Sequence, residues 1–96
     1  MKFEWNQNKN QSNLIKHGVD FEESKSVFND MFALIIDDRA HSNLERREII
    51  VGQSSESRLL YVVFSETGTC IRIISARKLT SAERRRYEKG RAIGRT

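Results

Sequence analysis

The sequence contains no proline, only one cysteine and no long apolar run. A lone thiol, Cys70, cannot form an internal disulfide, which excludes a small disulfide-framed secreted domain and fits a reducing compartment. No apolar stretch approaches the ~18 residues that span a membrane, and the first residues lack the apolar core of a signal peptide. We therefore expect a cytoplasmic protein with no membrane contact.

Positive charge is what the sequence has in excess. Seventeen lysine and arginine residues stand against thirteen acidic residues in a chain of 96, which gives a formal net charge of +4. The pI of about 9.6 favours polyanionic partners such as RNA, DNA or an acidic protein segment, and charge alone does not choose among them. The length, with no linker or internal repeat, predicts a single domain over residues 1–96.

Local patterns predict the helices and the first strand. Alternating residues over 2–6 indicate a short strand, and a helix follows over 6–18, capped by Asn6 and stopped by Gly18. A second helix is predicted over 19–30 because Asp20 and Glu23 form a capping-box pattern. A last helix is expected to begin at the capping box of Thr80 and Glu83 and to stop at Gly90.

Strand-like runs fill the second half of the chain. Short polar turns separate the last three runs, as in an antiparallel meander. The whole pattern predicts an α+β fold in which the helices cover one face of an antiparallel sheet. The four runs cover residues 32–37, 47–54, 58–66 and 69–77.

The hairpin between the last two runs determines the faces of the predicted sheet. A two-residue turn at Thr67 and Gly68 would pair Phe64 with Ile71. The face under the helices would then carry Leu60, Val62, Phe64, Ile71, Ile73 and Ser75. The opposite face would carry Leu59, Tyr61, Val63, Cys70, Arg72, Ile74 and Ala76. A slip of one residue would exchange the two faces.

An arginine inside a strand, Arg72, requires a partner because burying an unpaired guanidinium group is costly. Water, a carboxylate or a ligand anion would satisfy it. A structural ion pair with Glu48 or Glu66 and an open anion site are both compatible with the sequence.

Several kinds of site have no signature in this sequence. No glycine-rich phosphate loop precedes a helix, and no Cys/His cluster has metal-ligand spacing, so we expect neither a metal nor a cofactor. The last helix has only Ala82 and Tyr87 as substantial apolar contacts. A solvated helix, a partner-binding helix and an RNA-facing helix remain alternatives for it.

Three stretches of the sequence resemble the BrnT family of type II toxins. They are FEWNQNKNQSNLIKHGVDFEESKSVFND, DDRAHSNLERREIIVGQS and IRIISARKLTSAERRRYE. The most specific parts are the segment from Lys16 to Glu23, the pair His41-Ser42, and RIISAR followed by Glu83 and Tyr87. The resemblance implies a RelE-like fold and a ribonuclease activity that arrests translation. It also implies a hetero-oligomer with a BrnA-type antitoxin, through which alone operator DNA would be bound.

Metal-free RNA cleavage requires three chemical groups. A base takes the 2′-hydroxyl proton, cations stabilise the phosphorane, and an acid protonates the leaving 5′-oxygen. Guanidinium suits the second task because it stays charged and binds phosphate with paired hydrogen bonds. The predicted catalytic residues are Arg47, Arg72 and Arg77 as phosphate contacts, with His41 as general acid or base and Glu45 behind it. The predicted RNA-binding residues are Tyr61, Arg85 and Tyr87.

Each of these residues also has a purely structural interpretation, such as an exposed arginine at a strand end or a ring over the core edge. The main alternative function is a non-catalytic basic binding module, either an inactive toxin relic or a regulatory partner protein. A DNA-binding repressor acting alone is disfavoured because no helix-turn-helix or ribbon-helix-helix pattern is visible. The enzyme hypothesis leads because of the family resemblance.

Overall fold

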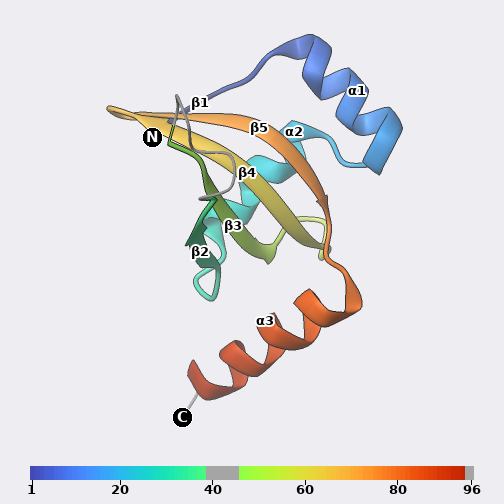
Figure 1. Ribbon diagram of the computed structural model, residues 1–96, viewed down its shortest axis with the longest axis vertical. Coiled ribbons are helices and arrows are strands. Elements are labelled where there is room, and N and C mark those ends of the chain that lie inside the picture. Colours follow the sequence, from blue (N-terminus) through green and yellow to red (C-terminus); the bar gives the residue numbers. More distant parts are fainter. Residues whose placement is uncertain (39–45, 95–96) are drawn as a thin grey trace.

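The computed structural model describes residues 1–38 and 46–94 and has an α+β fold (Figure 1). This class agrees with the prediction. Among the described residues, no helix combines the length and the apolar character needed to cross a membrane. The elements are β1 (Lys2–Glu4), α1 (Gln7–His17), α2 (Phe21–Lys25), the 3-10 helix η1 (Ser26–Asn29), β2 (Leu34–Asp37), β3 (Glu48–Gln53), β4 (Leu59–Thr67), β5 (Cys70–Lys78) and α3 (Ser81–Gly94).

The described residues form a sheet of five strands, in the order β1-β5-β4-β3-β2. Strands β2 to β5 form the predicted antiparallel meander, since each pairs with its neighbour in the chain. Strand β1 pairs with β5 in parallel. The expectation of a purely antiparallel sheet was therefore wrong, because the first strand joins the free edge of β5 and makes the sheet mixed.

The helix starts follow the predicted caps. The Oδ1 atom of Asn6 accepts a hydrogen bond from the backbone N–H of Lys9 at 3.0 Å. α1 ends at Gly18, whose left-handed backbone (φ +70°) lets its N–H bond back to the helix. Asp20 caps α2 by accepting from the N–H of Glu22 at 2.8 Å.

Two predicted helix ends were wrong. The second helix is not continuous over 19–30, because α2 ends at Lys25 and the tighter η1 turn follows. The last helix does not stop at Gly90 but continues to Gly94. No proline follows to end it, and a glycine inside a helix costs only about 1 kcal/mol.

The helices α1 and α2, with η1, pack on one side of the sheet, which we call the first face. Its core is the larger of the two apolar clusters found among the described residues, and all of its members are at most 3% exposed. The predicted apolar face is thereby confirmed as the face under these helices. The cluster consists of Val19, Phe21, Val27, Ile50, Leu60, Val62, Phe64, Ile71, Ile73 and Ala76.

The β4–β5 hairpin has a different register from the predicted one. Thr67 pairs with Cys70 and Phe64 pairs with Ile73, so the turn begins at Gly68. Gly68 has a φ of +61°, which a glycine adopts without strain. The shift is by two residues, and an even shift leaves both sheet faces as predicted up to this point.

A β-bulge then changes the faces of β5. The pairing shifts between Val63 and Phe64, which leaves Ile74 as the extra residue. Beyond it, Ser75 pairs with Val63, whereas Ala76 packs into the first-face core. The faces predicted for Ser75 and Ala76 are therefore exchanged.

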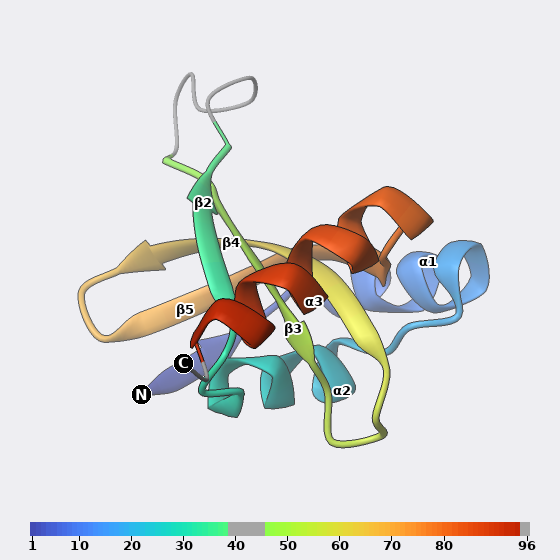
Figure 2. The ribbon, with the colours of Figure 1, turned by 90° about the horizontal axis from the view of Figure 1, so that it is seen from below.

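Helix α3 lies across the opposite side of the sheet, the second face (Figure 2). Its Tyr87 is 2% exposed and clusters with Ile49 and Val51 of β3. The expectation that the helices cover a single face was wrong, because this tyrosine anchors α3 on the second face. The side chains packed around this cluster are Phe32, Leu59, Tyr61, Val63 and Leu79.

Candidate functional site

Two arginines share one row of the second face. Arg72 is exposed and pairs with Ser65 of β4 on one side and Glu4 of β1 on the other. Arg47 directly precedes β3, and its carbonyl oxygen accepts from the N–H of Asp38 at 3.0 Å, so the ladder continues past the strand. Continued register places Arg47 across Ser65 from Arg72, with the two backbones ~10 Å apart. This spacing allows two guanidinium groups to approach one anion from both sides.

The strand register places the two carboxylates considered as partners of Arg72 on the other face of the sheet. Glu66 pairs with Ile71 and Glu48 pairs with Phe64. Both carboxylates therefore project on the first face, because directly paired residues point to the same side of a sheet. Arg72 projects on the second face, away from both.

Arg77 belongs to a second cluster on the same face. Its Nη1 and Nη2 atoms donate to Oε1 and Oε2 of Glu83 at 2.8 Å and 2.9 Å, and its Cζ atom lies 3.9 Å from the ring centroid of Tyr61. The hydrogen bonds from Arg77 lower the pKa of Glu83 from 4.5 to about 2, and the same bonds raise the pKa of Arg77. Arg77 thus joins β5 to α3 and stacks on Tyr61 at the same time.

The same carboxylate begins α3. Oε1 of Glu83 accepts from the backbone N–H of Thr80 at 2.8 Å, and the Thr80 hydroxyl accepts from the N–H of Glu83 at 3.2 Å. The predicted capping box is confirmed. Glu83 therefore starts the helix and holds Arg77 with one side chain.

Asp30 fixes the middle of α3 to the sheet. Its Oδ2 atom accepts from the Tyr87 hydroxyl at 2.5 Å and from the N–H of Gln53 at 2.7 Å, while Oδ1 accepts from the N–H of Phe32 at 2.9 Å. A Cβ atom at Gly52 would lie 2.9 Å from this Oδ2, so the close approach requires glycine. The buried position of Tyr87 does not suit the RNA contact predicted for it, and we assign it a structural role.

Asn13 of α1, for which no role was predicted, holds the backbone next to the bulge. Its Nδ2 atom donates to the carbonyls of Ala76 and Val19 at 2.8 Å and 2.9 Å, and its Oδ1 accepts from the N–H of Ala76 at 3.1 Å. These bonds fix both backbone groups of the residue before Arg77. The available signal was an asparagine within a helix that has few apolar residues to bury.

An ion pair between the half-buried Arg58 and the buried Glu23 ties the β3–β4 hairpin to α2. Arg58 donates from Nε to Oε2 of Glu23 at 2.9 Å and from Nη2 to Oε1, and the Ser54 hydroxyl donates to the same Oε2 at 2.7 Å. The Arg58 hydrogen bonds, more than any other cause, lower the pKa of Glu23. Glu23 is therefore turned away from the cap, and the capping box predicted for it with Asp20 is not formed.

The other predicted residues have different surroundings. Tyr61 is half-buried, with Arg77 over one ring face, and Arg85 is exposed on α3. His41 and Glu45 lie outside the described residues. In the described part of the chain, no three His, Cys, Asp or Glu side chains are grouped so that they could hold a metal ion.

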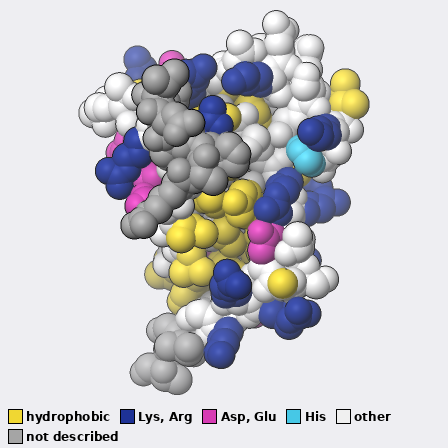
Figure 3. All heavy atoms as spheres, viewed as in Figure 1, with side chains coloured by type: hydrophobic (Ala, Val, Ile, Leu, Met, Phe, Trp, Pro, Cys, Tyr) yellow, Lys and Arg dark blue, Asp and Glu magenta, His cyan; other side chains and the backbone are white. Residues whose placement is uncertain are grey.

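Apolar side chains lie between these basic groups, and Figure 3 shows an apolar patch bordered by lysine and arginine. Strand β2 is at the sheet edge, where Leu34, Ile35 and Ile36 are 42%, 59% and 52% exposed. Leu34 and Ile36 also line a cavity of about 80 Å³, together with Tyr61 and with Arg86 of α3. The second face therefore combines exposed cations, an aromatic ring and an open apolar edge.

Comparison with known proteins places this chain in a family. The family described as "Ribonuclease toxin, BrnT, of type II toxin-antitoxin system" matches residues 5–83. No curated protein matches the sequence. Among solved structures, the Brucella abortus ribonuclease toxin BrnT is similar, with 24% sequence identity, a TM-score of 0.65 and coverage of 84% of this chain and 99% of that one, a likeness that shows the fold. Because the family match spans most of the sequence, the chain belongs to the BrnT family of ribonuclease toxins of type II toxin–antitoxin systems.

Proposed function

We propose that this protein is a metal-independent endoribonuclease that cleaves RNA and thereby inhibits translation. The observation that carries the proposal is the row of Arg72 and Arg47 on the second face, beside the stack of Arg77 on Tyr61. Guanidinium groups stay charged and bind phosphate through paired hydrogen bonds without a metal ion. The family supplies the reaction class, and the net charge of +4 favours a polyanionic substrate.

In the proposed reaction, the 2′-oxygen of a ribose attacks the adjacent phosphorus. A general base takes the 2′-hydroxyl proton, the bond from phosphorus to the 5′-oxygen breaks, and a general acid protonates that oxygen. Arg72 and Arg47 hold the non-bridging oxygens, where negative charge accumulates in the phosphorane. The role of Arg72 is supported by its exposure on the second face.

His41 is the proposed general acid or base, because the ordinary pKa of histidine lies near neutrality, and Glu45 is its proposed support. Both belong to the segment 39–45, which joins β2 to β3. On either side of this segment, Asp38 and Arg47 are joined by a backbone hydrogen bond. Arg47 belongs to the row of proposed phosphate contacts. This placement favours residues of the segment as the proton-transfer groups.

Tyr61 and Arg77 are proposed to contact a neighbouring part of the RNA. Tyr61 lies four residues from Ser65 along β4, which is ~13 Å at the usual strand rise. An aromatic ring at this distance suits stacking with a base, and the exposed Arg85 on α3 suits a contact with the RNA backbone.

A BrnA-type antitoxin is the proposed partner, in a hetero-oligomer that binds operator DNA through the antitoxin. The exposed edge of β2 supports this partner, because the strand leaves apolar side chains open on both faces of the sheet. Leu34 and Ile36 belong to the second face and Ile35 to the first. No proline or lysine protects this edge, so an extended antitoxin segment can add a strand there. A RelE-like fold and a cytoplasmic location accompany this proposal.

The test is an RNA cleavage assay with the purified protein in EDTA. The wild type is expected to produce new fragments, and Arg72→Ala to lose about 100-fold in rate or more while keeping its circular dichroism spectrum. Lys16→Ala, which removes one positive charge from α1, is the matched control and is expected to cleave normally. RNA retention without fragments, with or without EDTA, would favour the non-catalytic binding module. Cleavage that occurs without EDTA and is lost when EDTA is added would overturn the metal-independent chemistry.

A further inference from the structure

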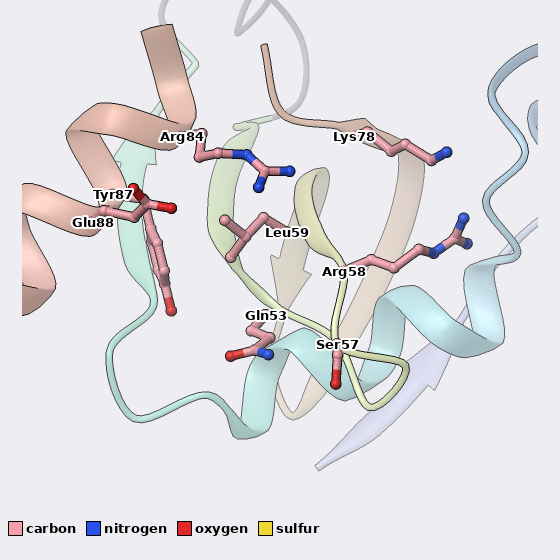
Figure 4. A pocket seen from close by; sticks show the side chains of 8 residues that line it. All are labelled: Gln53, Ser57, Arg58, Leu59, Lys78, Arg84, Tyr87 and Glu88. Carbon is pink, nitrogen blue, oxygen red and sulfur yellow. The ribbon is translucent and has the colours of Figure 1, made fainter. Parts of the chain in front are cut away.

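A pocket outside the row of Arg72 lies between the β3–β4 hairpin, the end of β5 and α3 (Figure 4). Its volume is about 410 Å³. Arg84 and Glu88 of α3 line one side, and both follow residue 83, where the family match ends. The family match therefore does not cover this part of the wall. On the side of the sheet, the pocket is lined by Gln53, Ser57, Leu59 and Lys78, among others.

We propose that this pocket binds one nucleotide of a single-stranded RNA, away from the phosphodiester that is cut. Lys78 and Arg84 contact its phosphate, and Leu59 lies against its base. The inference rests on the proposed ribonuclease function and gives the same substrate a second binding region.

The charges of the pocket favour a phosphate between β5 and α3. Arg58 also lines it, but its charge is compensated by Glu23. Lys78 and Arg84 are exposed, and the described residues offer neither of them an ion-pair partner. Figure 4 shows Arg84 reaching from α3 towards Leu59. Lys78 and Arg84 thus line the pocket as two cations against one carboxylate, Glu88.

The floor and the hairpin end suit a base. Leu59 is half-buried and presents an apolar surface, while Gln53 and Ser57 add an amide and a hydroxyl group that can bond to base edges. Ser57 has a φ of +62°, an unusual backbone conformation for a residue other than glycine. The turn therefore holds Ser57 in a sparsely populated conformation at the pocket wall.

The pocket adjoins the candidate site through two pairs of successive residues. On β5, Arg77 stacks on Tyr61, and the next residue, Lys78, lines the pocket and accepts a bond from Arg77 Nη1 through its carbonyl at 3.1 Å. On α3, Glu83 holds Arg77, and the next residue, Arg84, lines the pocket. The pocket therefore lies beside Arg77, within reach of an RNA strand bound there.

The experiment measures binding of a short single-stranded RNA whose 2′-O-methyl groups prevent cleavage. Lys78→Gln with Arg84→Gln is expected to weaken binding about tenfold and to reduce the slope of log K against log salt by about 0.7 for a single phosphate. Lys16→Gln with Lys89→Gln removes the same charge elsewhere and is the matched control, with a change below about threefold. Glu88→Gln is expected to tighten binding, because a carboxylate repels a phosphate in the pocket.

The possible outcomes distinguish RNA binding in the pocket from binding of a free anion, and failure of this inference from failure of the proposed function. A double variant that binds like its control, or a Glu88→Gln variant without tighter binding, would overturn the pocket as an RNA site. Inorganic phosphate or adenosine monophosphate that binds at Lys78 and Arg84, with RNA binding unaffected, would assign the pocket to a free anion and also overturn it. If the wild type cleaves RNA and the double variant binds RNA as tightly as its control, only this inference fails. If the wild type neither binds nor cleaves RNA, the proposed function fails too.

Discussion

Replacing Glu83 by glutamine removes the charge that joins β5 to α3 and keeps the shape of the side chain. Glutamine is also accepted in a capping box, so the bond to the N–H of Thr80 can persist. The variant therefore tests the paired bonds from Arg77, at 2.8 Å and 2.9 Å, with little change to the start of α3.

The pKa of Glu83 gives the expected magnitude. A lowering from 4.5 to about 2 corresponds to at most about 3–4 kcal/mol, at ~1.4 kcal/mol for each pKa unit. The side chains of Arg77 and Glu83 are 34% and 28% exposed, so solvent screening reduces this figure. We expect Glu83→Gln to lower the free energy of unfolding by roughly 1–2 kcal/mol at pH 7.

The pH dependence has a definite sign. A carboxyl group whose pKa is lowered by folding stabilises the protein fully above its unfolded pKa, near 4.5, and this contribution is lost as the pH falls through the folded pKa of about 2. The difference between wild type and Glu83→Gln should thus be largest at neutral pH and shrink below pH 4.5. Urea denaturation at several pH values measures it, with Glu66→Gln, an exposed first-face carboxylate, as the control. Equal stability at pH 7, or a difference that does not shrink on acidification, would refute the reasoning.

Four further substitutions test other parts of the structure. Asn13→Ala removes three buried hydrogen bonds and should cost about 2–4 kcal/mol in urea denaturation, and a loss below about 1 kcal/mol would contradict this account. Asp30→Asn replaces the oxygen that accepts from both the Tyr87 hydroxyl and the N–H of Gln53. It should lower the free energy of unfolding by about 2 kcal/mol and alter the near-ultraviolet circular dichroism, whereas Tyr87→Phe should lower it by only about 1 kcal/mol. Ile35→Lys should leave stability within about 0.5 kcal/mol and weaken the complex with the cognate antitoxin at least about tenfold, as titration calorimetry would show. An unaffected complex would remove the β2 edge from the interface.

Features that depend on a few neighbouring residues could be predicted from the sequence. The caps at Asn6, Asp20 and Thr80 are examples, because a short side chain bonds to a backbone N–H two or three residues away. The apolar face of the β4–β5 hairpin was also predictable, since an error of two residues in register does not exchange the faces.

Features that depend on distant residues could not be predicted in this way. Asp30 meets Tyr87 across 57 positions in the chain, and Asn13 meets Ala76 across 63. Glu23 had a plausible local role in a cap, but the more distant Arg58 and Ser54 bind its carboxylate instead. A local pattern contains no information about such competition. Local patterns therefore suggest residue types for the candidate site, whereas the arrangement of these residues depends on distant contacts.

The orientation of Arg77 shows how packing on the first face sets the chemistry of the second. Side chains alternate along a strand, so two residues five positions apart, such as Arg72 and Arg77, would normally point to opposite faces. The extra residue at Ile74 restores Arg77 to the face of Arg72, because a bulge changes the alternation by one. Asn13 bonds to both backbone groups of Ala76 just beyond the bulge, on the side where α1 packs. Arg72 and Arg77 therefore share one face of the sheet, and a buried amide under the opposite face fixes the backbone that separates them.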